Sequence, residues 1–268
     1  MKFVIFVLCF VFFVFGPRAE AASYSCLVEP ARTLALGVPV AGLVDKISVR
    51  RGDLVKKGQL LISLASQAES AEAELAKFKA EQIGPLQMAQ AKAEFAKKKF
   101  ERKKALGGER LMSIQEVDEA ESEYRMAQSE IVTAKENKSS SSIEYKQRSA
   151  LLALRSVYSP FDGVVVDQAV FPGEVVEPGK GNSILKVAKI DILHVRAILP
   201  KEMFGKIKVG QKAMIETEIM KRKDMMATVR SVDRVVDAAS GTFVMVLEMN
   251  NPKLDIPVGV RCKAEFLN

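Results

Sequence analysis

The sequence is poor in the side chains that most active sites use for chemistry. It has one histidine and three cysteines. The histidine, His194, lies in a strand-like run without an identifiable nucleophile beside it, and Asp162 and Asp191 follow turn signals without a recognisable partner. Nucleophilic and acid–base catalysis need such groups in positioned pairs. We therefore expect a non-enzymatic protein.

Long apolar runs are also scarce. One spans Phe3–Phe15, between a lysine and a Gly-Pro pair. It is shorter than the roughly 20 residues that a helix needs to cross a bilayer, and alanines at positions 19 and 21 fit a signal-peptidase site. We predict that residues 1–21 are a signal peptide cleaved before Ala22, with a retained anchor as the alternative. The mature chain is then an exported, soluble protein.

The chain lacks a basic stripe. Its formal net charge is +7, but residues 66–150 hold 15 basic and 15 acidic side chains, and the excess is spread over the flanking segments. Nucleic-acid binders gather their cations on one face. The distribution argues against nucleic acid as a partner and favours a solvated surface.

The sequence does contain a repeat in two separated pieces. Residues 38–64 and 159–187 align at an offset of 121 positions. The matched pairs are Pro39 and Pro160, Gly42 and Gly163, Val44 and Val165, Val49 and Val170, Gly52 and Gly173, Asp53 and Glu174, Val55 and Val176, and Gly58 and Gly179. Each piece reads as short strands with turns and is too small to bury its apolar face alone. We expect the two halves to pack into one β-sandwich.

The segment between the halves reads as a helical hairpin. It is rich in Ala, Glu, Lys and Gln, which is typical of long helices, and large residues alternate with alanine at heptad spacing. The seam residues are Leu86, Ala89, Ala93, Ala96 and Phe100 in the first arm and Val117, Ala120, Tyr124, Ala127, Ile131 and Ala134 in the second. Arms of about 40 residues reach roughly 60 Å.

The turn of the hairpin has its own signals. Gly107 and Gly108 favour a helix C-terminus, and Ser113 with Glu116 forms a capping-box pattern that starts the second arm. Lysines and arginines crowd the end of the first arm and acidic residues the start of the second, as helix dipoles favour. This basic run is therefore interpreted as structural.

A defect lies at the same distance from the turn in both arms. Gly84 and Pro85 interrupt the first arm, and Lys138 with the serines at 139–142 interrupts the apolar seam of the second. Proline inside a helix removes a hydrogen bond. We predict a bend or flexible joint at this level in both arms.

The chain after the second half reads as a short helix from Pro200 and five strands separated by turns, which suggests a small antiparallel β-barrel. The predicted organisation is a signal peptide (1–21), an N-terminal strand joining the barrel (22–36), the first half of the sandwich (37–65), the hairpin (66–154), the second half (155–189) and the barrel (190–268).

Together these segments resemble a known family. A split motif written as VPVAGLVDKISVRRGDLVKKGQLLISL and SPFDGVVVDQAVFPGEVVEPGKGNSILKV, with a helical hairpin in the gap, is similar to the lipoyl or biotinyl-like domains of HlyD-like membrane fusion proteins. These are periplasmic adaptors of bacterial efflux and secretion systems. The resemblance implies an elongated α+β protein, peripherally associated with the inner membrane. It implies a TolC-type outer-membrane channel, an inner-membrane transporter of unknown class and a ring of further copies, by analogy a hexamer, as partners.

The resemblance also implies a docking site. In the family the hairpin tip contacts the channel through an arginine, a leucine four residues on and a serine seven further, a spacing that Arg102, Leu106 and Ser113 keep. The structural alternative is that Arg102 serves the helix dipole, Leu106 packs the last turn and Ser113 only caps the next helix. We predict that the three residues dock on the channel.

Three other functions remain as alternatives. A carrier role needs a lysine at the turn between lipoyl halves, and the LASQA segment at 64–68 has none, so we expect no cofactor. A type I secretion adaptor is the nearest alternative, less favoured because the leader reads as cleavable. Methionine thioethers bind monovalent copper, so a copper-efflux adaptor using Met220, Met225 and Met226 is a third, although methionine more often fills cores.

Two cysteines, Cys26 and Cys262, remain after removal of the signal peptide. Export favours disulfides, and we hypothesise that the two are bonded, with two buried reduced thiols as the alternative. In the adaptors the N-terminal segment can add a strand to the barrel. That topology would bring the two cysteines close together.

Overall fold

The computed structural model describes residues 23–108, 112–179, 181, 183–220 and 225–267. The signal peptide predicted over residues 1–21 lies outside these residues. Contacts divide the described chain into two compact units. One unit is formed by residues 34–187 and the other by residues 23–33 together with 188–267. Each has its own hydrophobic core.

The unit formed by residues 34–187 contains a small β-sandwich. One sheet has the order β5-β4-β2-β7, and β3 pairs with β6. The strands are β2 (Gly42–Ile47), β3 (Leu54–Val55), β4 (Leu60–Leu64), β5 (Ser156–Tyr158), β6 (Gly163–Gln168) and β7 (Val175–Val176). Val44 and Leu61 from the first half share one buried core with Val165 from the second. The predicted packing of two distant stretches into one sandwich is confirmed.

The two halves are related by an approximate two-fold symmetry. Strands β6 and β7 begin and end 121 residues after β2 and β3. The N–H of Gly52 donates to the carbonyl of Val165, and the N–H of Gly173 donates to the carbonyl of Val44, each at 2.8 Å. Both glycines have φ above +90°, where a side chain would be strained. The shared glycines therefore mark equivalent turns.

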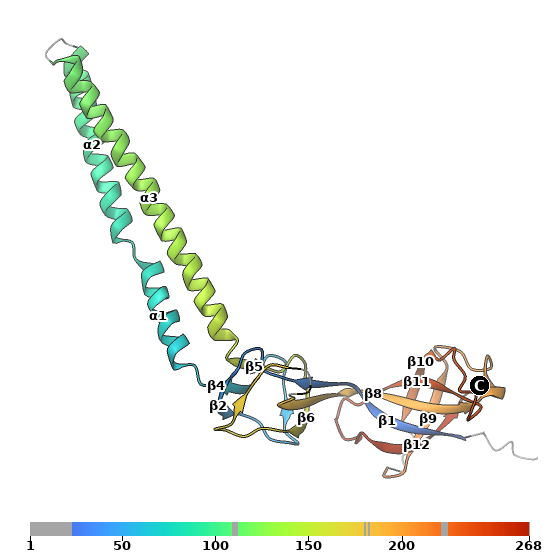
Figure 1. Cartoon of the computed structure of the whole chain (residues 1–268). Coiled ribbons are helices and arrows are strands. Elements are labelled where there is room, and N and C mark those ends of the chain that lie inside the picture. The colour runs from blue at the N-terminus through green and yellow to red at the C-terminus, as the bar shows by residue number, and fades with distance from the viewer. Residues whose placement is uncertain (1–22, 109–111, 180, 182, 221–224, 268) are drawn as a thin grey trace, which may run out of the picture. The chain divides into compact units, whose positions relative to one another are not determined.

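Between the halves the chain forms two antiparallel helical arms (Figure 1). The first arm consists of α1 (Gln67–Glu81) and α2 (Gly84–Gly108), and the second is α3 (Ile114–Ala153). The seam is lined by small buried side chains, namely Ala73, Ala76, Ala89, Ala93, Ala96, Ala120 and Ala127. Toward the tip the rings of Phe100 and Tyr124 stack with centroids 6.3 Å apart. Among the described residues, no helix combines the length and apolarity that a membrane crossing requires.

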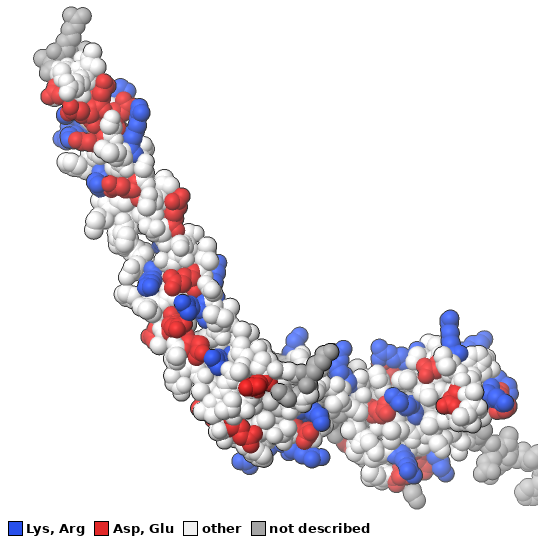
Figure 2. Space-filling view, in the orientation of Figure 1, with Lys and Arg blue, Asp and Glu red and all other residues white. Residues whose placement is uncertain are grey.

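Charged side chains of both signs alternate along the hairpin (Figure 2). Among the described residues, three ion pairs connect the arms: Lys92 Nζ lies 2.5 Å from Glu130 Oε1, Lys99 Nζ lies 2.6 Å from Glu123 Oε2, and Arg148 Nη1 lies 2.6 Å from Glu72 Oε2. All three pairs are largely exposed, so each contributes little stability. They mark which flank of one arm faces which flank of the other.

The predicted joint is confirmed in the first arm and wrong in the second. The first arm is interrupted at Gln82 and Ile83, and Pro85 lies in the first turn of α2, where its missing N–H costs nothing. The second arm is one helix through residues 138–142. Serine costs a helix only a few tenths of a kcal/mol relative to alanine, and Ser141 Oγ donates to the carbonyl of Asn137 at 3.1 Å. Loss of apolar seam residues alone therefore does not break α3.

The other unit is a closed antiparallel barrel. The strand order is β1-β12-β9-β10-β11-β8, and β1 also pairs with β8. The elements are β1 (Ser23–Leu36), β8 (Leu185–Pro200), the 3-10 helix η1 (Lys201–Met203), β9 (Lys212–Thr217), β10 (Met226–Val232), β11 (Thr242–Asn250) and β12 (Val260–Phe266). Strands β1 and β8 each extend by a few residues into the unit of residues 34–187. Alternate side chains, including Val195, Met245 and Leu247, fill the barrel.

Candidate functional site

The tip of the hairpin is held by the cap of α3. Ser113 Oγ accepts a hydrogen bond from the Glu116 N–H at 3.3 Å, and Glu116 Oε2 accepts one from the Ser113 N–H at 3.1 Å. This is the capping box that the sequence predicts. The side-chain hydrogen bond from Ser113 and then its backbone N–H lower the pKa of the Glu116 carboxyl. Ser113 therefore has a structural role at the position where the docking residue is expected.

The other two predicted docking residues lie on the last turns of α2, and both are exposed. Among the described residues Arg102 forms no ion pair, whereas its neighbours Lys99 and Lys103 contact α3. Leu106 is 40% exposed, so it is only partly used in packing the last turn. All three predicted residues thus lie at the tip and are exposed, and Ser113 differs from the other two in that its side chain takes part in the capping box.

Several cations of the basic run beneath the tip make contacts that hold the two helices of the hairpin together. Lys99 holds Glu123 across the seam, and its hydrogen bond lowers the pKa of that carboxyl. Lys103 Nζ donates to the carbonyl of Glu116 at 3.4 Å, and Lys104 Nζ lies 5.6 Å from the centre of the Phe100 ring. The cations therefore stabilise the ends of the two helices, as the sequence interpretation expects.

One exposed tip residue escaped the sequence analysis. Ile114, the first residue of α3, is 81% exposed. It borders a hollow of about 200 Å³ together with Gly107, Met112 and Val117. The available signal was an isoleucine directly after an N-cap serine, outside the heptad seam. The tip therefore offers apolar surface as well as Arg102, a cation without an ion pair among the described residues.

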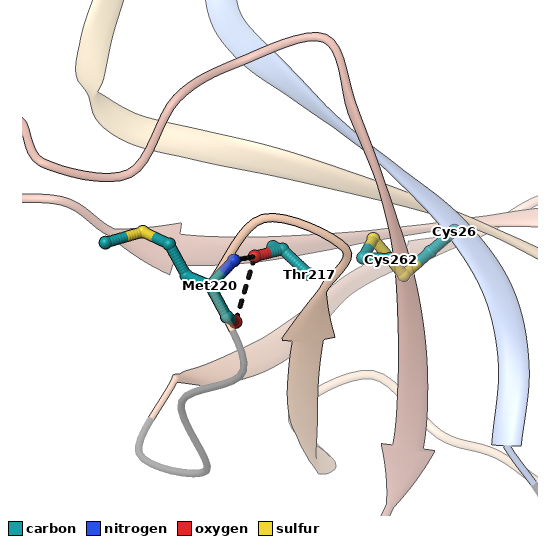
Figure 3. The surroundings of a disulfide bond; sticks show 4 residues. All are labelled: Cys26, Thr217, Met220 and Cys262. Atoms are coloured by element: carbon teal, nitrogen blue, oxygen red, sulfur yellow. Dashed lines mark hydrogen bonds between the residues drawn. A yellow bond between two sulfur atoms is a disulfide. The ribbon is translucent and has the colours of Figure 1, made fainter.

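The second candidate site is the cysteine pair in the barrel (Figure 3). Cys26 in β1 and Cys262 in β12 lie directly opposite each other, and the structure joins them by a disulfide with a Cα–Cα distance of 4.8 Å. Thr217 in β9 is the neighbour of Cys262 on the other side. Its hydroxyl accepts from the Met220 N–H at 3.0 Å and donates to the Met220 carbonyl at 3.1 Å. The bond links the first strand of the barrel to the last.

Two of the three candidate copper ligands differ in their surroundings. Met225 is buried in the barrel core, whereas Met226 is 41% exposed at the start of β10. Consecutive residues of a strand point to opposite faces. Met220 is joined through its backbone to Thr217, and residues 221–224 lie outside the described residues. Within the described chain, no group of three or more His, Cys, Asp and Glu is placed to hold a metal ion.

The polar residues without an assigned role in the sequence have structural partners. Arg230 donates to Glu248 at 2.8 Å and lies 3.2 Å from His194 Nε2, across three neighbouring strands. Asp162 Oδ1 accepts from the Lys57 N–H at 2.6 Å. Asp191 Oδ2 lies 3.7 Å from Lys189 Nζ, while Asp191 Oδ1 is buried without a hydrogen-bond partner among the described residues. None of these contacts places a nucleophile beside a base.

Comparison with known families gives a match over more than half of the chain. The family model described as a CzcB-like, barrel-sandwich hybrid domain matches residues 32–189. These residues comprise the sandwich and the hairpin between its halves.

Curated relatives are similar over most of this chain. The nickel and cobalt resistance protein CnrB of Cupriavidus metallidurans is 28% identical over 92% of this chain and 60% of its own length. The macrolide export protein MacA of Escherichia coli O157:H7 is 26% identical over 69% of this chain and 51% of its own length. The chain thus spans 60% and 51% of the length of these two relatives.

Solved structures show the same fold. MacA from Actinobacillus actinomycetemcomitans aligns with a TM-score of 0.72 at 21% identity, covering 92% of this chain and 78% of the other. The membrane fusion protein Spr0693 from Streptococcus pneumoniae R6 aligns with a TM-score of 0.62 at 14% identity, covering 92% and 99%. A split sandwich, an inserted hairpin and a barrel are therefore shared with membrane fusion proteins.

Proposed function

Because the chain belongs to the CzcB-like barrel-sandwich hybrid family of membrane fusion proteins, we propose that it is the periplasmic adaptor of a tripartite efflux pump. In this proposal it joins an inner-membrane transporter to a TolC-type outer-membrane channel and performs no catalysis itself. The named relatives are an export protein and metal-resistance proteins. Similarity to these proteins supports a role in efflux.

The observation that carries the proposal is the exposed tip of the hairpin. Ser113 and Glu116 fix the start of α3, so the last turns of α2 are presented on a stable end. Arg102 is a cation without an ion pair among the described residues, and Leu106 and Ile114 add apolar area. A guanidinium beside apolar contacts suits docking on a folded partner, since arginine is enriched in interface hot spots.

The sides of the hairpin support association of several copies. Met88 and Phe95 are exposed on α2, one heptad apart and two residues after seam positions 86 and 93. Met126 is exposed on α3. Exposed apolar residues in a row favour contact with another surface. A ring of copies, by family analogy six, would place such flanks against one another.

The test combines export with physical capture. A strain lacking its own copy is complemented with the wild-type chain, with the tip variant Arg102→Ala/Leu106→Ser, or with the control Lys98→Ala/Ile143→Ser. The control removes one exposed cation of α2, Lys98, which lies one turn below Arg102 and is paired with Glu94, and one exposed apolar side chain far along α3 from the tip. Because relatives are named for macrolides and for nickel, cobalt, zinc and cadmium, resistance to these compounds is measured together with co-purification of the channel.

We expect the tip variant to recover at least tenfold less channel and to lose resistance, with the control behaving as wild type. A tip variant that captures as much channel as wild type would refute the docking assignment. Loss of resistance to a single compound class would identify the cargo.

A further inference from the structure

The connection between β8 and β9 crosses one end of the barrel. These strands are not neighbours, because β10 and β11 lie between them in the sheet order, so residues 201–211 pass across this end. Ile207 is buried, and Met203 packs against the barrel core. The same segment turns Phe204 and Val209 outward, where they are 48% and 65% exposed. The connection therefore closes the barrel on its inner side and presents apolar residues on its outer side.

The loop between β10 and β11 adds apolar residues to the same end. The strand register places the start of β11 opposite the end of β8, and the Lys201 N–H donates to the Gly241 carbonyl at 2.9 Å. The loop therefore lies beside the connection. Within it Val235 is 80% exposed, and its neighbour Val236 is also exposed. Two adjoining loops thus expose apolar side chains at positions where turns ordinarily carry polar ones.

Both loops are held in shape by contacts of their own. Asp237 Oδ1 accepts hydrogen bonds from the N–H groups of Ala239 and Ser240 at 2.8 and 3.1 Å. The ring of Phe204 meets that of the core residue Phe243 edge-on, with centroids 5.5 Å apart. The apolar side chains are therefore displayed by a fixed frame rather than by fraying ends.

Cations surround these apolar residues. The exposed cations of the two loops, which form no ion pair among the described residues, are Lys201, Lys206, Lys208 and Arg234. The anions are Glu202, Asp233 and Asp237, and the carboxylate of Asp237 is turned onto the backbone of its own loop. The balance therefore favours positive charge. The end surface is defined as these four cations together with Phe204, Val209, Val235 and Val236.

The N-terminal part of the chain reaches the barrel at this same end. Ser23, the first described residue, pairs with Glu265 near the end of β12, and the Leu267 N–H that follows β12 donates to the carbonyl of Lys212 at the start of β9. In the sequence the apolar run Phe3–Phe15 ends eight positions before Ser23. Eight residues span at most about 28 Å. A leader held in a bilayer therefore keeps this end of the barrel near the membrane.

We propose that the end surface binds the surface of a membrane that contains anionic lipid. The apolar side chains enter the boundary of the acyl chains, while the lysines and the arginine stay at the level of the headgroups. A side chain as exposed as Val235 protrudes, and it enters a fluid bilayer without the matching pocket that a folded partner would need. Once the leader is removed, this contact holds the mature barrel at the membrane.

This inference deepens the proposed function, because it assigns the association of the adaptor with the inner membrane to one surface of the barrel. It rests on that function for the choice of membrane. It does not depend on docking of the hairpin tip, which uses other residues.

Vesicle flotation tests the contact. The mature chain from Ala22 is mixed with vesicles of phosphatidylethanolamine and phosphatidylglycerol, or of phosphatidylcholine alone, and its partition is measured in a density gradient. The end variant is Phe204→Ser/Val235→Ser. The control Phe171→Ser/Val175→Ser removes the same residue types from a turn of the sandwich, where they are 59% and 72% exposed. Thermal melting checks that each variant folds.

Wild type and control should float with the anionic vesicles, and the end variant should partition at least tenfold more weakly. Lys206→Glu/Lys208→Glu should weaken partition by a similar factor, because cations near an anionic surface are attracted and anions are repelled. The matched change Arg51→Glu/Lys56→Glu in the sandwich should leave partition unchanged. Binding of wild type to phosphatidylcholine should be weaker than to the anionic vesicles.

Fluorescence locates the inserted residues. The chain contains no tryptophan, so a single introduced one reports its own surroundings. With anionic vesicles, the emission of Phe204→Trp should shift to shorter wavelength and be quenched by brominated lipid. The emission of Phe171→Trp should show neither change.

Four results would overturn the proposal: a wild type that does not float with anionic vesicles, equal flotation with phosphatidylcholine, an end variant that floats as wild type does, or equal quenching of the two tryptophans. Failure of flotation with normal channel capture would leave the docking function standing. Flotation without channel capture would refute docking alone and leave the membrane contact standing.

Discussion

Reduction of the Cys26–Cys262 bond should destabilise the barrel selectively. The two cysteines are 236 residues apart in sequence, but that whole length is not the relevant loop. When the barrel alone unfolds, the sandwich still holds the ends of its own segment together, with the Ile184 N–H bonded to the Leu36 carbonyl at 2.8 Å. The flexible part of the loop is then residues 27–33 and 188–261. For a loop of about 80 residues, chain entropy predicts a loss of about 4 to 5 kcal/mol on reduction.

The assay must resolve the barrel from the hairpin. Pulsed hydrogen exchange with mass spectrometry along a urea series reports peptides of each unit separately. With a slope of about 2 kcal/mol per M urea, the unfolding midpoint of the barrel peptides should fall by about 2 M in the reduced protein. Peptides of α2 and α3 should keep their midpoint and provide the internal reference.

Two controls test whether the disulfide stabilises the barrel by closing this loop. The variant Cys26→Ala/Cys262→Ala should unfold near the reduced protein and show no response to reductant. Barrel peptides that unfold at the same urea concentration with and without reductant would show that closing this loop contributes nothing. A fall of the hairpin midpoint equal to that of the barrel would show that the two units unfold together, contrary to the assumption about the loop.

Four further perturbations test the hairpin. Ser113→Ala removes the cap of α3 and should cost about 1 kcal/mol, measured as faster amide exchange in the first turn of α3, whereas Ser113→Asp should retain protection. The pKa of Glu116 is lowered from its ordinary 4.5 in the folded state, so its contribution is present above that pH and is lost as the pH falls through the lowered value; a first turn of α3 equally protected at pH 3 and pH 7 would contradict this. Ala127→Leu overfills the seam and should destabilise the hairpin by about 1 to 3 kcal/mol in circular-dichroism melting, with exposed Val132→Leu unchanged. Arg155→Leu removes the ion pair with Glu69 in the first turn of α1 and a hydrogen bond to the Ala41 carbonyl worth about 1 kcal/mol, and should speed exchange in the first turn of α1.

Those parts of the fold could be predicted from the sequence in which a residue type favours a single local structure. Gly52 and Gly173 both take positive φ at equivalent turns, so a repeat of glycines translated directly into a repeat of turns. Alanine at heptad spacing likewise predicted the seam between the arms, because small side chains allow two helices to pack closely against each other. The joint predicted in the second arm was inferred from its distance to the tip. An equal distance from the tip gives no physical reason for a helix to break. Proline interrupts hydrogen bonding whereas serine does not.

The candidate sites were less predictable, because a binding surface consists of the side chains that neither packing nor ion pairing within the fold has used. Arg102 and Lys99 look alike in the sequence, yet Lys99 is paired with Glu123, whereas Arg102 has no ion pair within the described part of the chain.

The break in the first arm has a cause beyond proline. Ala76 in α1 and Ala89 in α2 are both buried against α3, and 13 residues separate them. At about 100° per residue, an uninterrupted helix would place Ala89 about 140° around the axis from Ala76. One of the two alanines would then face solvent. The non-helical step at Gln82 and Ile83 resets the phase so that both helices present their small residues to α3.

Replacing Gly84 and Pro85 by alanine should therefore leave the break in place, even though both changes favour helix. The same double change with one extra alanine after Ile83 brings the separation to 14 residues and the angular offset to about 40°, so the helix should then run through. Amide exchange of residues 83–86 distinguishes the two: it should stay fast in the first variant and slow at least tenfold in the second. Slow exchange in the first variant would mean that proline alone makes the joint and that the alanine seam tolerates a shift of phase.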